Sequence, residues 1–512
     1  MKRIVSISLV AATMALGSTA DDIADLQKQI DKLKKQVIKN KKQSANDNIK
    51  WGVDLRTSID SINYDMADGK SYENNSLMAM RLWLNMAYAA DEKNIFKGQL
   101  SMNKAFGADF RDPFNTPGGN RTFSLGGMFD WTGNEALTDN SLKVRRAFWL
   151  YLGDDAFGQG IDWTFSIGRR PSTNGFLGNL SQDDSASSPL AHVINVEFDG
   201  FSSKLDLSKI TGVDGMSFKV CLGQGSTNAA PLFANSTPYA EEDDQLNGIS
   251  LGGFIFEPYN DGQFIVKTTW YRAFDLPGMD VDMSTGQQLG FKQYGDMDGA
   301  AISILVDGVT EDGYGSDVKV FGSYAWSKTD PLEGEAMLGS MDSETGSSYW
   351  FGAYLPVGES ARYGTLGLEY NHGDQYWRPF TYAEDTMIGS KLAARGDAFE
   401  LNYTYQITKA LSLQARYVNI DYDYTGSQGF FGNTSGASMA IDDVKDGAAA
   451  WRRLGGTSDP DSAQVVVGNL MASGMSQEQA VGAATQMGMA ASFLPSIVES
   501  AQDFRFYLRY RF

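Results

Sequence analysis

The chain has 512 residues and a formal net charge of −20, with 55 Gly, 10 Trp, 23 Tyr and 29 Phe. This acidity argues against nucleic acid as a partner, and the single cysteine, Cys221, excludes an internal disulfide framework. Richness in glycine and aromatic residues at moderate hydrophobicity is typical of a β-barrel with aromatic girdles and tight turns.

The N-terminus carries an export pattern. Lys2 and Arg3 precede an apolar run at 4–17 and a small-residue cleavage site at 18–20, which predicts a secretory signal peptide over 1–20. No later run reaches the ~18–20 uninterrupted apolar residues that a spanning helix needs. If the mature chain lies in a membrane, it therefore spans it as a closed barrel.

The segment 21–40 predicts a coiled-coil helix. Its apolar residues are spaced alternately three and four apart, as in a heptad seam, and they are Ile23, Leu26, Ile30, Leu33 and Val37. We expect this seam to support oligomerisation. The alternative is a solitary amphipathic helix that lies on the barrel or on peptidoglycan. A polar linker follows at 41–50.

Alternating apolar and polar residues recur from residue 51 to residue 512, in about sixteen stretches. The connections after even-numbered stretches are short, and those after odd-numbered stretches are long. This predicts an all-β, antiparallel transmembrane barrel of 16 strands, with 14 to 18 as the acceptable range. The sixth strand is expected to start near His192, with a bulge near Gly200 where the apolar parity changes.

The connection 425–502 is the longest. It contains sequences typical of helices at 462–471 and 476–494. Three interpretations stay open: the insert caps the mouth of the barrel, folds into its lumen, or is a surface loop.

The last ten residues, 503–512, form the clearest strand pattern. Apolar residues occupy every second position: Phe504, Phe506, Leu508, Tyr510 and Phe512. The three arginines Arg505, Arg509 and Arg511 lie between them and therefore face the other side of the strand. This strand resembles the C-terminal closing strand of Gram-negative outer-membrane barrels. The resemblance implies an outer-membrane location with a periplasmic N-terminal helix, contact with lipid and lipopolysaccharide, and insertion by the outer-membrane assembly machinery.

A barrel of sixteen strands is wide enough for an aqueous channel. The phase of the alternation predicts a basic inner wall, formed by Arg56, Arg81, Lys97, Arg145, Arg170, Arg416, Arg505 and Arg509, with Lys219, Lys267 and Lys319 also inward. Inward acids are fewer: Asp54, Asp162, Glu197, Glu369 and Glu400. In the alternative interpretation, the arginines extend to the rims or pair with wall acids.

The segment 143–171, with KVRRAFWLYLG and then SIGRRP, resembles trimeric porins of the phosphate-selective type. The resemblance implies a homotrimer whose third loop narrows the channel. Arg145 and Arg170 would then guide anions, and Asp183 and Asp184 would belong to the constriction. The chain lacks a dense arginine–lysine ladder along one loop, so strict phosphate selectivity is not expected.

The sequence thus predicts a passive porin for small hydrophilic solutes and ions, anionic or neutral, with a mild anion preference. Alternatives are a surface-exposed binding or adhesion barrel that uses its acidic loops and, third, a hydrophobic-substrate transporter. Neither enzymatic activity nor a metal or cofactor is expected, because the chain has only His192 and His372 and no serine-nucleophile motif.

Overall fold

The computed structural model describes residues 49–107, 136–138, 140–170, 174–229, 239–240, 248–281, 288–381, 386–433 and 436–512. The expected signal peptide and the heptad seam at Ile23 to Val37 lie outside these residues. No helix within them is long and apolar enough to cross a membrane.

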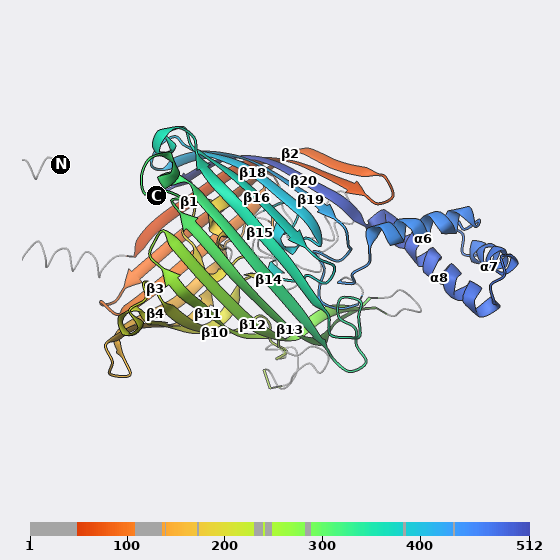
Figure 1. The fold of residues 1–512 in the computed structure, drawn as a ribbon, viewed down its shortest axis with the longest axis horizontal. Helices are drawn as coiled ribbons and strands as arrows, with labels where there is room; N and C mark the ends of the chain where they lie inside the picture. The colour runs from red at the N-terminus through yellow and green to blue at the C-terminus, as the bar shows by residue number, and fades with distance from the viewer. Residues whose placement is uncertain are drawn as a thin grey trace, which may run out of the picture.

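Sixteen antiparallel strands close into a barrel, which confirms the predicted fold and strand number (Figure 1). In order around the barrel they are β1 (Lys50–Met66), β2 (Ser71–Ala89), β3 (Asn94–Ala105), β4 (Lys143–Ala156), β5 (Ile161–Arg170), β9 (Phe198–Asp206), β10 (Ser217–Gln224), β11 (Ser250–Asn260), β12 (Phe264–Val281), β13 (Gln288–Asp307), β14 (Lys319–Pro331), β15 (Thr345–Pro356), β16 (Thr365–Gly373), β18 (Gly396–Gln406), β19 (Leu411–Tyr422) and β20 (Val498–Arg511).

The C-terminal strand closes the barrel. β20 pairs with β19 on one side and with β1 on the other, where Arg56 lies opposite Arg509. Backbone hydrogen bonds join Val53 and Phe512 in both directions, at 3.1 and 3.0 Å. Pairing along this seam supplies the backbone hydrogen bonds that lipid cannot supply.

The predicted alternation of short and long loops is wrong at two places. After β1 the chain turns within 67–70, and between β12 and β13 only 282–287 separate the strands. The residues that were expected to form long loops here belong to the strands, which are 17 to 20 residues long in these two hairpins. A transmembrane strand needs only about 9–11 residues, so these hairpins extend beyond the thickness of a bilayer.

The prediction for the sixth strand is also wrong. His192 lies before that strand, in a turn of the chain between β7 (Ser187–Leu190) and β8 (Ile194–Asn195). The sixth barrel strand, β9, starts at Phe198 and pairs with β5 and β10 without a bulge. The change of parity that suggested a bulge marks the boundary between an inward-folded segment and the wall.

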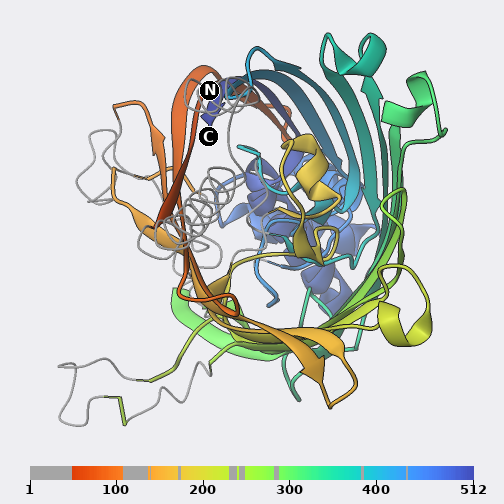
Figure 2. The ribbon, with the colours of Figure 1, turned by 90° about the vertical axis from the view of Figure 1, so that its left-hand side faces the viewer.

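Two segments fold into the barrel and fill part of it (Figure 2). The first holds β6 (Gly175–Phe176), α4 (Gly178–Ser181), β7 and β8, and the second holds β17 (Phe380–Thr381) and the 3-10 turn η4 (Lys391–Ala393). β8 pairs with β17 and β6 with β7, both in parallel. A Cβ atom at Gly346 in β15 would lie 2.1 Å from the backbone nitrogen of Trp377, so the second segment packs directly on the wall.

A hydrophobic core joins these segments to one side of the barrel. Its wall residues come from β11 to β15 and include Leu251, Tyr271, Met297, Phe321 and Trp350. The infolded segments contribute Phe176, Leu177, Leu190, Val193, Trp377 and Phe380. The inner face of β11 to β15 therefore packs against this core, so the aqueous channel that was predicted does not extend along this side of the barrel.

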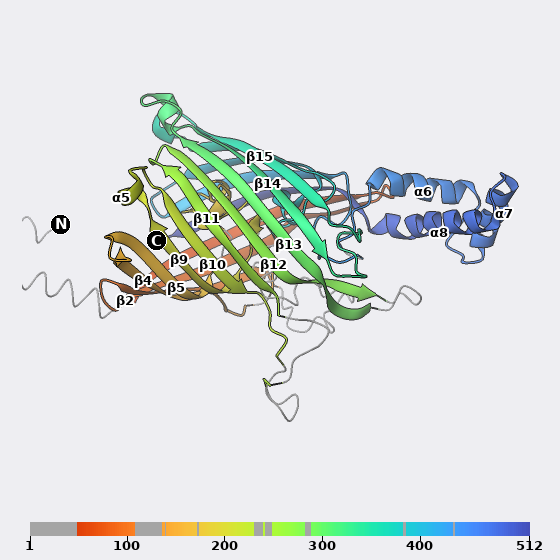
Figure 3. The same cartoon turned by 60° about the horizontal axis from the view of Figure 1, so that its bottom comes forward.

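The long last connection forms a helical unit beyond one end of the barrel, away from the end at which the C-terminus lies (Figures 1 and 3). It consists of α6 (Ile441–Arg453), α7 (Ser462–Ala472), α8 (Gln477–Phe493) and the short turn η5 (Leu494–Ser496). Ser476 caps α8 in a capping box with Gln479, as the sequence indicated. Three remaining short turns, α5 (Ser208–Thr211), η2 (Tyr314–Asp317) and η3 (Glu359–Ala361), join strands at the opposite end.

Candidate functional site

In the closing strand the outer face of the barrel is apolar and the inner face is charged. In β20 the exposed fractions of Phe504, Phe506, Leu508 and Tyr510 are 50, 43, 39 and 45%, while those of Asp503, Arg505 and Arg509 are at most 3%. A water-soluble protein has the reverse distribution and rarely exposes so large an apolar surface. The pattern is that of strands whose apolar side faces lipid.

Arginines of the predicted basic wall lie where β20 meets β1, and buried carboxylates face them. Arg509 Nε donates to Asp54 Oδ1 at 2.9 Å, and Arg505 Nε donates to Asp60 Oδ1 at 2.5 Å. Arg81 in β2 lies 3.6 Å from Asp54. Arg56 stacks on the ring of Tyr507, 5.2 Å from its centre.

Two further arginines of the set also have buried carboxylate partners. Arg145 lies 3.2 Å from Glu197, and Arg416 lies 3.2 Å from Glu400. Lys391, from the second infolded segment, contacts Glu400 and lies 2.6 Å from Glu369. Opposite charges at such distances largely cancel each other's long-range field. This part of the wall is therefore a structural ion-pair network.

The two acids expected at a constriction lie at the edge of this network. Asp184 Oδ1 accepts from Arg509 at 2.7 Å and from Arg511 at 3.1 Å, and Asp183 contacts Arg511. The first infolded segment is thus fastened to the C-terminal strand by its carboxylates.

A bulge in β4 turns two consecutive arginines to the inside. Register shifts opposite Gln99, so that Arg146 pairs with Gln99 and Val144 pairs with Leu100, which leaves Arg145 as the extra residue. Arg145 is 1% exposed and stacks on Trp83 at 4.2 Å, while Arg146 lines a cavity. The sequence favoured only Arg145 for the inside, because strict alternation allows one of two neighbours.

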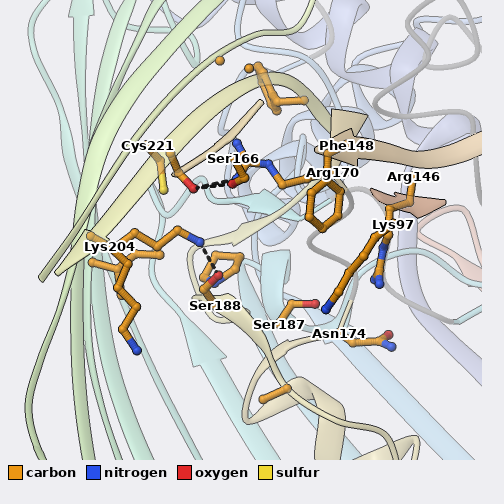
Figure 4. Close-up of a pocket in the computed structure, with 18 of the residues that line it drawn as sticks. Lys97, Arg146, Phe148, Ser166, Arg170, Asn174, Ser187, Ser188, Lys204 and Cys221 are labelled. Atoms are coloured by element: carbon orange, nitrogen blue, oxygen red, sulfur yellow. Dashed lines mark hydrogen bonds between the residues drawn. The ribbon is translucent and has the colours of Figure 1, made fainter. Parts of the chain in front are cut away.

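A cavity of about 760 Å³ lies inside the barrel, between β3, β4, β5, β9, β10 and the first infolded segment (Figure 4). Six basic residues line it: Lys97, Arg146, Arg170, Lys204, Lys219 and Lys267. Its lining acids among the described residues are Asp54, Asp184 and Glu257, and each is within ion-pair distance of an arginine or lysine.

No ion pair joins the remaining basic side chains of the cavity to a carboxylate in the described part of the chain, although Glu197 and Asp206 still act on Arg146 and Lys204 from a longer distance. Arg170 Nη1 donates to the hydroxyls of Ser166 and Ser202 at 2.5 and 2.6 Å, and Lys219 Nζ donates to Ser188 at 2.6 Å. Lys97, Arg146 and Lys204 complete this set of five. We call these five residues the basic cluster. Of the residues predicted to face inward, Lys97, Arg170 and Lys219 belong to it.

Sequence reasoning missed two members of the basic cluster. Lys204 was missed because Ile194 and Val196 were assigned to the same strand as Lys204. That assignment reversed which residues of the strand were expected to face inward. The alternation of Phe201, Ser203 and Leu205 outward within β9 alone places Lys204 inward. Arg146 required the bulge. Lys319 and Asp162, predicted to face the inside, lie near the ends of strands and pair with Asp307 at 2.6 Å and Lys209 at 2.8 Å.

His192 has a structural environment. Its ring is fully buried between Ser323 and Ser348, each at 2.8 Å, and packs against Trp350 and Trp377. Burial lowers its pKa to about 3, so the imidazole is neutral at physiological pH. Cys221 lines the cavity, as expected for a small wall residue.

Comparison with solved structures finds barrels of low similarity. OmpT of Vibrio cholerae is 12% identical with a TM-score of 0.41 and covers 91% of this chain and 97% of its own. OprB of Pseudomonas putida is 10% identical with a TM-score of 0.43, over 91% and 94% of the two chains. The outer-membrane channel DcaP of Acinetobacter baumannii is 10% identical with a TM-score of 0.41, over 91% and 97%.

No curated protein matches the chain. One sequence family does, and its profile covers residues 71–455, which include every barrel strand except β1 and β20. The chain therefore belongs to the family described as "Protein of unknown function (DUF3373)".

Proposed function

We propose that the protein is a passive outer-membrane channel for small hydrophilic solutes, with a preference for anions. The apolar outer face and the closed barrel support an outer-membrane location. Strand β1 starts, and strand β20 ends, at the end of the barrel with the short turns, which supports a periplasmic N-terminus. A homotrimer is part of this proposal. It rests on the heptad seam at 21–40, and chemical cross-linking in native membranes tests it.

The basic cluster is the observation that carries the anion preference. Five cations face one cavity, whereas the cavity's described acids already have basic partners. Fixed charges beside a low-dielectric wall attract counter-ions more strongly than charges in exposed loops, which salt screens within about 8 Å. The net acidity of the chain is therefore a weaker influence on permeation than this cluster.

The reversal potential of the purified protein in a planar bilayer under a KCl gradient tests the proposal. We expect the sign of an anion-selective channel, and Lys204→Gln combined with Lys219→Gln should move the potential toward cations. A matched control is Lys93→Gln with Lys445→Gln, which removes the same charge from exposed ion pairs outside the cavity. A cation-selective wild type that the first pair leaves unchanged would contradict the anion preference.

A further inference from the structure

The cavity with the basic cluster is lined by two chemically different surfaces, and we infer that it binds organic anions that carry a compact apolar body. This inference rests on the proposed channel function and names its preferred solute. Selectivity for anions requires only the positively charged surface of the cavity. The other surface is apolar, and anion selectivity does not explain it.

The charged surface is concentrated on neighbouring strands. Lys204 in β9 and Lys219 in β10 are direct cross-strand partners, and both line the cavity. Like charges in such a pair repel, because their Cβ atoms are only about 5 Å apart. Arg170 donates to Ser202, which is the next residue of β9 on the same face as Lys204. Three cations thus face one small volume, and a bound anion would relieve their repulsion.

The second surface of the cavity is apolar. The first infolded segment contributes Ile194 and Val196, β9 contributes Phe198, and β11 contributes Leu251 and Ile255. Ile255 is the cross-strand neighbour of Lys219, so charged and apolar surfaces meet within one row of the sheet. A fully hydrated inorganic anion gains nothing from these side chains, whereas an apolar body loses unfavourable contact with water there.

The aromatic ring of Phe148 lies beside the charged surface. The guanidinium of Arg170 lies 5.8 Å from the centre of the Phe148 ring, and Phe148 lines the cavity beside Arg146. A planar carboxylate ligand would find a ring to stack on and guanidinium groups to bind its oxygens. The hydroxyl groups of Ser187 and Ser188 and the amide of Asn174 add neutral hydrogen-bond partners on the infolded segment.

The size of the cavity agrees with a small organic ligand. Its volume of about 760 Å³ falls within the range of ~300–1,000 Å³ that is usual for such sites. The solute class is therefore a monocarboxylate or dicarboxylate on an aromatic or branched aliphatic body. Inorganic phosphate, which offers charge without an apolar body, is expected to bind less well.

Block of the chloride current through single channels by benzoate, acetate and inorganic phosphate tests this solute class. All three probes are anionic, and only benzoate has a large apolar body. We expect the half-blocking concentration of benzoate to be at least about tenfold lower than that of acetate or phosphate. The reason is that burial of the apolar ring should increase affinity by more than about tenfold.

Variants assign the effect to the two surfaces. Phe148→Gln should reduce the benzoate advantage several-fold and leave acetate block unchanged, while Phe148→Leu, which keeps an apolar side chain, should retain most of it. Lys204→Gln with Lys219→Gln should weaken block by all three anions. Equal block by benzoate, acetate and phosphate in a channel that conducts anions would overturn the inference but leave the proposed function intact. A protein that forms no channel would instead remove the proposed function.

Discussion

Arg509 in the last strand of the barrel donates from Nε to Oδ1 of Asp54 in the first strand, at 2.9 Å. Both side chains are buried in the seam that closes the barrel. Asp54 also has Arg81 nearby, and Arg509 also binds Asp184 of the first infolded segment. One ion-pair network thus joins the two ends of the sheet and fixes the infolded segment to them.

Removal of both partners from this pair should destabilise the barrel by less than the sum of the two single removals. Asp54→Ala leaves Arg509 with a weaker set of partners in a buried site, and loss of one member of a buried pair typically costs about 3–5 kcal/mol. The double variant Asp54→Ala with Arg509→Ala should lose less than the sum. Urea midpoints of the folded barrel in detergent give the double-mutant cycle, and additive losses would contradict the coupling.

Phe512→Ala should impair assembly of the barrel in cells, and deletion of 503–512 should abolish it. The closing strand supplies the hydrogen bonds on which both β1 and β19 depend, and each unsatisfied backbone group in lipid costs several kcal/mol. Heat-modifiable migration and protease resistance in isolated outer membranes measure assembly. Phe157→Ala, in a turn and 82% exposed, is the matched control and should assemble normally.

Lys391→Met should loosen the second infolded segment. Its ammonium group binds Glu369 and Glu400, and all three side chains are at most 4% exposed. Without it two carboxylates remain in a buried site, where Arg416 still faces Glu400 but Glu369 keeps the neutral donors Trp350 and Tyr354. The segment should therefore leave the wall more often. We expect larger and noisier single-channel conductance. Lys445→Met, which removes an exposed ion pair on α6, should leave the conductance unchanged.

His192 should make the stability of the protein sensitive to acid. Its pKa is lowered from 6.5 to about 3 in the folded state, so the unfolded chain binds more protons between these two values. Stability from this site is therefore complete above about pH 6.5 and decreases as the pH falls toward 3, by up to about 1.4 kcal/mol per pH unit. The difference in unfolding free energy between wild type and His192→Gln should shrink over this range. A constant difference would show that His192 does not carry the effect.

The sequence by itself determined the barrel. Sixteen alternating stretches are present in the described structure, and the pattern is clearest in β18 and β20, where one face meets lipid and the other the lumen. Alternation is a local property of an extended backbone, so it is legible without tertiary contacts. The helices at α7 and α8, with the Ser476 cap, were predictable for the same reason.

Tertiary structure decided what the inner face does. Alternation places Arg416, Arg505 and Arg509 inside but does not show that Glu400, Asp60 and Asp54 lie within ion-pair distance of them, because these partners come from other strands. It also cannot distinguish an infolded segment such as 194–196 from a strand, since both are extended and partly apolar. Which cations are left to face a cavity depends on register, on the bulge at Arg145 and on the segments packed inside, and each of these arises only when distant parts of the chain meet.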